Sequence, residues 1–219
     1  MKVNRHGKAK ILSQEEIQLL FSEGLLLPRD RTLMAVMLFT AVRVNEAVTL
    51  LTKDIYDRKG RVRPELTVRK SNTKGKLATR SIPVLEDLRR RLENYQPTYD
   101  NGYLFPGLWG KGHLHRDTGC LILKRACERV GIDGVSTHSF RRTALTLMSN
   151  MGIPLRIIQE ISGHRNLDQL QKYLEVEPDQ VRGAIAELSM LAPTEDKKIE
   201  KYTYLDPRIK PTRQRNKRR

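Results

Sequence analysis

The sequence predicts an α+β fold that is mostly helical and carries a small three-stranded antiparallel sheet. Apolar residues recur at helical spacing along most of the chain. The stretch from Ile55 to Val84 differs, because turn signals there separate short segments of strand character. The 219 residues are 38% hydrophobic, which is enough to fill a core. No internal repeat or linker divides them, so we expect one domain.

Three helices are predicted before the sheet. Ser13 and Glu16 form a capping box, in which a hydroxyl and a carboxylate three residues apart cap each other's backbone. Pro28 is typical of a first helical turn and precedes an apolar run. A third helix is expected across Arg43–Leu51, because its apolar residues lie at helical spacing.

Dipeptides of lysine and glycine at positions 59–60 and 74–75 predict the turns of the sheet. Glu65–Arg69 and Thr79–Val84 are the expected strands, and helix returns from Glu86 to Tyr95. A loop over 96–118 comes next. The remaining helices are expected at 117–130, 138–151, 154–161, 166–172 and 178–191, with glycines at 131, 152 and 163 ending three of them.

The charge indicates a polyanionic partner. Lysine and arginine number 41 against 25 acidic residues, for a net charge of +16. Residues 1–10 hold four basic residues and residues 207–219 hold seven, with no acid in either segment. Basic ends on a mildly basic body favour nucleic acid, although a ribosome-associated protein could have the same balance. Aromatic residues make up only 5% of the chain, too few for a single-strand stacking platform, so duplex DNA is favoured.

Other classes are disfavoured by what the sequence lacks. No apolar run approaches the 18 residues or more of a membrane span, and the first ten residues do not resemble a secretory signal. We therefore expect a cytoplasmic protein associated with the nucleoid. With five histidines and no CxxC or HExxH motif, the chain has no pattern of metal ligands, and we expect no metal and no cofactor.

Two fragments of the second half could form a site. His138 and Arg141 are three apart, so they share one helix face, although two solvated polar residues would give the same pattern. Tyr173 follows the Gly163-His164 pair by nine residues, which places tyrosine and histidine on opposite faces of a continuous helix. The two can meet only if the chain bends, and Asn166 offers a new N-cap there, with Asp168 as an alternative.

Arg43 is the third candidate. It follows an apolar helix directly, where it is either a surface charge or a buried clamp for an anion. Glu46, three residues later, could anchor it from below.

Taken together, these fragments resemble the catalytic domain of the tyrosine site-specific recombinases, or phage integrases. Their order and spacing match over about residues 11–192, between a basic N-terminal segment at 1–10 and a basic C-terminal tail at 193–219. Only about ten residues precede this region, so we expect no N-terminal clamping domain, as in the short recombinases that invert fimbrial promoter segments. The sequence departs from the family at Ala41, where glycine is frequent, at Ser162, where leucine is usual, and at Arg142, where histidine is common.

The resemblance implies a DNA recombinase that needs neither metal nor ATP. Tyr173 would attack a DNA phosphate to give a 3′-phosphotyrosine, while arginines hold the phosphate. The general acid would be a hairpin lysine, for which Lys74 is favoured and Lys76 is next. The implied catalytic set is Arg43, Lys74, His138, Arg141, His164 and Tyr173.

The resemblance also implies partners and alternatives. Four copies would act on two duplexes, with possible accessory proteins that bend DNA. An apolar stripe at Val181, Ile185, Leu188 and Leu191 would pack on a neighbouring copy or on the same subunit's core. The alternatives are a type IB topoisomerase-like enzyme that nicks and reseals one strand, and a catalytically idle DNA-binding regulator with the same fold.

Overall fold

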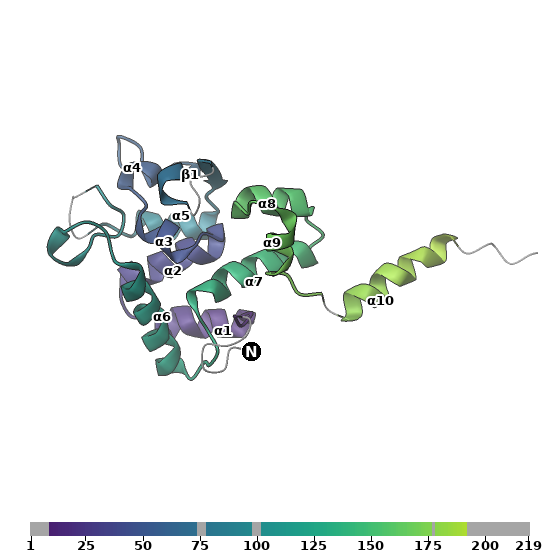
Figure 1. Cartoon of the computed structure of the whole chain (residues 1–219). Coiled ribbons are helices and arrows are strands. Elements are labelled where there is room, and N and C mark those ends of the chain that lie inside the picture. Colours follow the sequence, from purple (N-terminus) through teal and green to yellow (C-terminus); the bar gives the residue numbers. More distant parts are fainter. Residues whose placement is uncertain (1–8, 74–77, 98–101, 177, 192–219) are drawn as a thin grey trace, which may run out of the picture. The chain divides into compact units, whose positions relative to one another are not determined.

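The structure is a computed structural model that describes residues 9–73, 78–97, 102–176 and 178–191 (Figure 1). These residues divide into two units, one that ends at Glu175 and one that begins at Val176. The first unit carries almost all of the fold. Two parts of the predicted chain, residues 1–8 and the tail at 193–219, lie outside the described residues.

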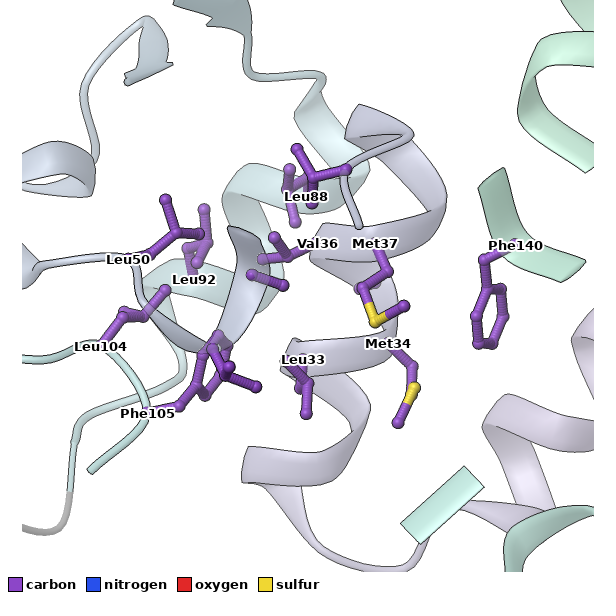
Figure 2. Packing of buried hydrophobic residues seen from close by; sticks show 14 of the residues in the cluster. Leu33, Met34, Val36, Met37, Leu50, Leu88, Leu92, Leu104, Phe105 and Phe140 are labelled. Atoms are coloured by element: carbon purple, nitrogen blue, oxygen red, sulfur yellow. The ribbon is translucent and has the colours of Figure 1, made fainter. Parts of the chain in front are cut away.

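Helix α2 (Pro28–Thr40) is the centre of the first unit. Its run from Leu33 to Met37 is fully buried, so this part of the helix is apolar on all sides, as expected for a helix inside a bundle. It packs against α3 (Val44–Val48), α5 (Glu86–Glu93), α6 (Arg116–Val130) and α7 (Thr137–Asn150). Figure 2 shows Leu33, Met34, Val36 and Met37 among side chains of the surrounding elements.

The N-terminal helix begins as predicted. In α1 (Gln14–Leu19) the Ser13 side chain accepts from the Glu16 N–H, and the Glu16 carboxylate accepts from the Ser13 N–H, so both halves of the capping box are present. A π-helical turn, η1 (Leu20–Gly24), continues the helix and packs on α6. Glycine is needed at position 24, because a Cβ there would lie 2.9 Å from the Ala126 carbonyl oxygen.

The predicted third helix is interrupted. Instead of one helix over Arg43–Leu51, α3 ends at Val48 and α4 (Thr52–Ile55) follows. Thr49 turns its hydroxyl onto the carbonyls of Asn45 and Glu46, at 2.7 and 3.2 Å. Side-chain bonds of this kind compete with the helical ladder, and the prediction of a continuous helix is wrong.

The sheet has two strands among the described residues, where three were predicted. β1 (Glu65–Val68) pairs antiparallel with β2 (Arg80–Pro83), with Leu66 opposite Ile82. The expected third strand is reduced to a single bridge between Tyr56 and Val62. The reason is local, because Tyr56 directly follows helix α4 and the chain then turns at once through Gly60, whose φ is +75°.

The second half of the first unit is helical, as predicted. Between β1 and β2 lies a short 3₁₀ turn, η2 (Lys70–Asn72), and another, η3 (Leu108–Gly110), lies in the long loop before α6. Helix α8 (Leu155–Ser162) follows α7 and precedes α9 (Leu167–Gln171). A small second core joins these three helices around Leu145, Ile158 and Leu170. Gly131 and Gly163 end α6 and α8 in the left-handed conformation, and Gly152 has a φ of +76° just after α7.

The second unit consists of α10 (Pro178–Glu187) and a 3₁₀ turn, η4 (Leu188–Leu191). Within the described residues, no helix has both the length and the apolar character to cross a membrane.

The order of helices and strands confirms the mostly helical α+β class predicted from the sequence, with a sheet one strand smaller than expected among the described residues.

Candidate active site

Arg43 lies at the N-terminus of α3, in an extended conformation that turns its side chain back over the helix. Its backbone N–H donates to one Glu46 carboxylate oxygen at 2.9 Å, and its guanidinium donates to the other at 3.1 Å. The Glu46 side chain is only 1% exposed, whereas that of Arg43 is 22% exposed. Glu46 thus anchors Arg43 from below, as predicted, and leaves part of the guanidinium open to a ligand.

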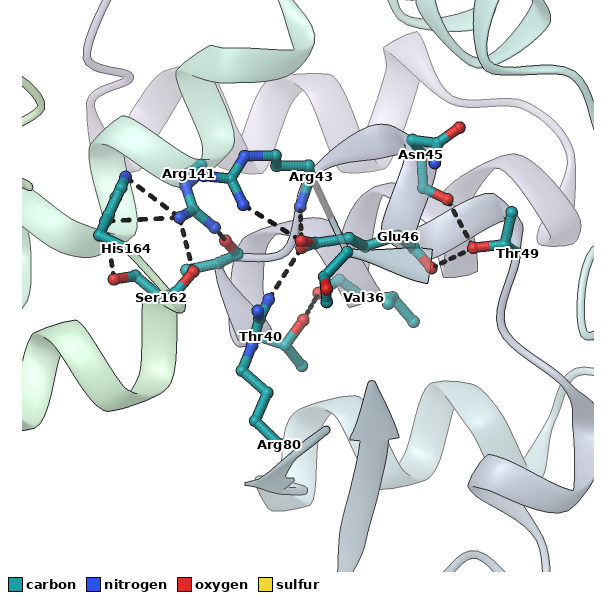
Figure 3. Close-up of polar contacts among 12 residues, drawn as sticks. Val36, Thr40, Arg43, Asn45, Glu46, Thr49, Arg80, Arg141, Ser162 and His164 are labelled. Carbon is teal, nitrogen blue, oxygen red and sulfur yellow. Dashed lines mark hydrogen bonds and ion pairs between the residues drawn. The ribbon is translucent and has the colours of Figure 1, made fainter. Parts of the chain in front are cut away.

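A second arginine, Arg80, shares Glu46 and was missed by the sequence analysis. Its Nη2 lies 2.8 Å from the Glu46 Oε2, and its side chain is 12% exposed (Figure 3). Alternation along β2 could have indicated it, since Arg80 and the buried Ile82 lie two apart on the same strand face. A buried arginine needs acceptors inside the protein, and for Arg80 the Glu46 carboxylate is one.

The backbone conformation and the surroundings of position 163 explain why a glycine precedes His164. The backbone at Gly163 has a φ of +64°, and a Cβ there would lie 2.1 Å from Arg80 Nη1. Arg80 therefore lies directly against the backbone at the end of α8. A side chain at position 163 would force the Arg80 guanidinium to shift from its place beside Glu46.

Arg141 is the most deeply buried cation of the site. Arg141 is only 1% exposed, so the alternative that it is a solvated surface residue is wrong. Nη1 donates to the Ala41 carbonyl and Nη2 to the Ser162 carbonyl at 2.6 Å, which joins the ends of α2 and α8 to α7. Ala41 is left-handed, with a φ of +52°, and ends α2. This conformation accounts for the frequent glycine at the matching position of the resembled family.

His164 lies beside Arg141 and is held by a hydroxyl. Nε2 is 3.2 Å from Arg141 Nη2, and Nδ1 is 2.8 Å from the Ser162 Oγ. Burial, then the charges of Arg141, Arg43 and Arg80, lower the pKa of His164 to about 3, so the imidazole is neutral. A neutral ring accepts from Arg141 at Nε2 and donates from Nδ1 to Ser162, whose hydroxyl donates to the Gln159 carbonyl.

Tyr173 reaches the site because the chain bends, as predicted. The Asn166 side chain accepts from the Gln169 N–H at 3.1 Å and begins α9, so α8 and α9 are separate helices. The Tyr173 ring lies 4.9 Å from that of His164, and the Arg141 guanidinium carbon is 5.7 Å from its centre.

His138 is exposed one turn before Arg141 on α7, with its ring 6.5 Å from that of Tyr173. The structure thus brings together five of the predicted residues. The two lysine candidates, Lys74 and Lys76, lie outside the described residues.

The site carries excess positive charge. Burial alone would raise the pKa of Glu46, but Arg80, the Arg43 backbone N–H, Arg141 and the Arg43 charge hold it below its usual value. Three guanidinium groups therefore face one ionised carboxylate. Burial, with Arg43 nearby, also lowers the pKa of Arg141, yet arginine keeps its charge in proteins. Such a cluster is suited to hold an anion next to the tyrosine ring.

The comparison with family models decides the relationship. The model of the phage integrase family matches residues 10–180, which include every residue of this site. The chain belongs to the phage integrase family. The resemblance that rested on Arg43, the His138-x-x-Arg141 pair, Gly163-His164 and Tyr173 is confirmed.

Relatives in the family are tyrosine recombinases. Over 190 residues the chain is 33% identical to tyrosine recombinase XerA of Pyrococcus furiosus. The matched region covers 83% of this chain and 63% of the relative. It is 30% identical over 184 residues to tyrosine recombinase XerD of Listeria monocytogenes, covering 78% and 59%. The chain therefore spans about three fifths of the length of these relatives.

Solved structures of recombinases share the fold. The crystal structure of XerA recombinase matches with a TM-score of 0.66 at 23% identity, over 84% of this chain and 64% of that one. XerH site-specific recombinase, in a post-cleavage complex with a palindromic difH substrate, also matches with a TM-score of 0.66. Identity is 21%, over 84% and 55% of the two chains.

Proposed function

We propose that this chain is a site-specific recombinase that cleaves and rejoins duplex DNA through a 3′-phosphotyrosine intermediate. The observation that carries this proposal is the Tyr173 ring beside the arginine cluster of Arg43, Arg80 and Arg141. Phosphoryl transfer to a tyrosine needs an oxygen nucleophile and cations at the non-bridging oxygens. Both lie within one small region of the first unit.

The reaction exchanges one phosphoester for another. The Tyr173 phenol oxygen bonds to phosphorus, and the bond from phosphorus to the 5′ oxygen breaks. The phenol proton passes to His138, and the leaving oxygen takes a proton from the hairpin lysine. Attack by a 5′-hydroxyl from another strand reverses these steps, so the covalent intermediate stores the bond energy and ATP is not required.

The arginines act on the charge that develops at phosphorus. Arg43 is partly open, and Arg141 is fixed by two carbonyls, so both can offer preorganised donors to the non-bridging oxygens. Losing one such donor costs about 3–4 kcal/mol in comparable sites. His164 can add a further hydrogen bond to the phosphate only in its other tautomer. In that form the Ser162 hydroxyl donates to Nδ1, and Nε2 carries the proton and no longer accepts from Arg141.

Duplex DNA and further copies of the chain are the proposed partners. The apolar residues Val181, Ile185, Leu188 and Leu191 of α10 and η4 support self-association. An apolar helix face of this kind is typical of an interface. Four copies on two duplexes would bring together the strands that are exchanged.

The test is covalent capture of DNA. A nicked suicide substrate with sequence flanking the gene is incubated with the protein, and the products are resolved on a denaturing gel. We expect a protein–DNA adduct with wild type, in EDTA as in its absence, and no adduct with Tyr173→Phe. An adduct with Tyr173→Phe would identify another nucleophile, and loss of the adduct in EDTA would contradict the metal-free mechanism.

A second substrate assigns the general acid. A 5′-bridging phosphorothiolate has a thiolate leaving group that needs no proton. It should restore cleavage to Lys74→Ala and leave Arg43→Ala inactive. Rescue of Lys76→Ala instead would move the assignment two residues along the hairpin.

The alternatives give different products. A topoisomerase-like enzyme would relax supercoils without joining paired sites, and an idle regulator would bind DNA without any adduct. The complete set of arginines, histidines and tyrosine in one site favours an active enzyme.

A further inference from the structure

Arg142 follows Arg141 on α7, but it points away from the anion site and is used by a different part of the chain. Its side chain is 6% exposed. Nη1 donates to the Ala9 carbonyl, and Nη2 donates to the Glu175 carboxylate. Its Nε has no hydrogen-bond partner among the described residues. A buried guanidinium of this kind depends on the few acceptors it has.

Glu175 lies two residues after the tyrosine, so this ion pair acts on the segment that carries it. Two side chains of α7, one helical turn apart, bond to that segment. The Thr146 hydroxyl donates to the Tyr173 carbonyl at 3.2 Å, and Arg142, four residues earlier on α7, holds Glu175. The other backbone bonds of Tyr173 and Leu174 stay within their own turn, to Leu170 and Gln171. The α7 contacts therefore fix the tyrosine segment relative to Arg141.

The N-terminal end of the first unit also bonds to Arg142. The Ala9 carbonyl accepts from Arg142, and three residues later the Leu12 N–H donates to the Thr143 hydroxyl at 2.9 Å. Two stretches more than 160 residues apart in sequence thus share one buried cation on α7. Movement of either stretch removes an acceptor from it.

We propose that Arg142 is a positioning residue that holds Tyr173 in its own subunit's site and couples this placement to the N-terminal segment. The inference rests on the proposed role of Tyr173 as nucleophile. While both acceptors are in place, the segment after Tyr173 is tied to α7 and the ring stays beside His164 and Arg141. Ala9 lies where the basic N-terminal segment joins the fold. Its displacement loosens the ion pair between Arg142 and Glu175, so that the segment carrying Tyr173 can move away from His164 and Arg141.

The first test measures the contact without relying on activity. Backbone hydrogen exchange is followed by mass spectrometry on the full chain without DNA. In Arg142→Met, exchange should rise at least tenfold in peptides covering 170–176 and in those covering 9–12. In Glu175→Gln it should rise in 170–176 alone. Unchanged exchange at 170–176 in both variants would overturn the proposal, because the ion pair would then hold nothing in place.

The second test measures the reaction on saturating duplex, so that binding and chemistry are separated. A displacement of about 1 Å at a reacting group costs on the order of 10²-fold in rate. Adduct formation should therefore fall about 100-fold in Arg142→Met and about tenfold in Glu175→Gln, with DNA affinity within about twofold of wild type. Arg142→Lys keeps the charge and one acceptor, so it should recover about tenfold relative to Arg142→Met.

Matched controls separate the possible failures. Arg90→Met removes an exposed arginine from ion pairs on α5 and should stay within about twofold of wild type. If Arg142→Met does not fold, Glu175→Gln keeps the test open, because the Glu175 side chain is 43% exposed. Wild-type adduct rates in Arg142→Met and Glu175→Gln would overturn the positioning role. Absence of any adduct with wild type would instead contradict the proposed function, while the exchange experiment still decides whether the contact holds the segment.

Discussion

The two halves of the site are built in different ways. In the anion-binding half, Arg80 and Arg141 are almost buried, and each bonds to an acceptor on another element. The tyrosine half is the end of α9 and the residues 172–175 that follow it. Tyr173 is half-buried against the second core, and α7 supplies two side-chain contacts. The first half is therefore held by buried polar bonds between elements, whereas the second is held by a small apolar contact and two side-chain bonds. Removing an arginine of the first half should affect both stability and chemistry, whereas removing the Tyr173 hydroxyl should affect chemistry alone.

The largest expected effect breaks the anion-binding half. Arg141→Ala should lower cleavage by at least about 10³-fold, because it removes preorganised donors. It should also destabilise the fold by about 3–5 kcal/mol, because the Ala41 and Ser162 carbonyls lose their donor and a cavity remains.

Urea denaturation and a single-turnover cleavage assay measure the two effects separately. Tyr173→Phe is the matched variant from the other half, and it should lose all cleavage while its free energy of unfolding stays within about 1 kcal/mol of wild type. An Arg141→Ala protein as stable as Tyr173→Phe would contradict the proposed difference between the halves.

A smaller effect is expected from the residues that position Arg43. Arg80→Ala should lower cleavage about 10- to 100-fold, because Glu46 keeps its ion pair with Arg43 only and can draw that guanidinium away from a phosphate. Gly163→Ala should act in the same direction, since its Cβ would displace the Arg80 guanidinium.

Combining the two changes tests whether they share one mechanism. The double variant should lose less than the sum of the two single losses, because the Arg80 contact can be lost only once. Additive losses would show that Gly163→Ala acts through the strain of its left-handed backbone rather than through Arg80.

The parts of the fold and of the site that sequence could predict are those whose evidence is local. The capping box at Ser13, the cap at Asn166 and the Arg43–Glu46 pair each join residues three apart, so spacing and capping rules reach them. The mostly helical class follows for the same reason, from periodicity within each segment.

The parts that sequence could not predict depend on contacts between distant segments. Arg80 meets Glu46 across 34 residues, and Arg142 meets Ala9 across 133 residues. No period or motif links such positions, and the departure from the family at Arg142 showed only that the residue was unusual. The described residues form no third strand for a local reason, because Tyr56 directly follows helix α4 and a strand cannot extend back into that helix.

The neutral His164 makes the stability of the anion-binding half depend on pH. Its pKa of about 3 in the folded protein lies below the ordinary value of 6.5. Between these values the unfolded chain binds a proton that the folded protein does not, so stability rises with pH and falls on acidification. From pH 6 to pH 5 the free energy of unfolding should fall by about 1 kcal/mol more in wild type than in His164→Asn, since the limit is about 1.4 kcal/mol per pH unit.

Urea denaturation in a buffer without phosphate measures this difference, because a bound anion would offset the cost of charging the ring. Equal pH dependence in wild type and His164→Asn would mean that the imidazole is protonated in the folded protein. In that case His164 would add a positive charge to the cluster, and the hydrogen-bond directions assigned at Ser162 would be wrong.

The smallest expected effect is at Ala41, where two features of the anion-binding half oppose each other. A left-handed alanine costs about 1–2 kcal/mol relative to glycine. Its methyl group, however, is fully buried in the second core with Leu145 and Ile158, and such a group contributes about 0.8 kcal/mol. Glycine also adds about 0.4–1 kcal/mol of conformational freedom to the unfolded chain. Ala41→Gly should therefore change the free energy of unfolding by less than about 0.5 kcal/mol. Cleavage should stay within about twofold of wild type, because the carbonyl that holds Arg141 remains.

Ala41→Val is the matched control and should be clearly destabilising, because a β-branched residue fits this conformation poorly. A loss above about 1.5 kcal/mol in Ala41→Gly, measured by urea denaturation, would show that packing in the second core, rather than the backbone turn, holds this end of α2 against Arg141.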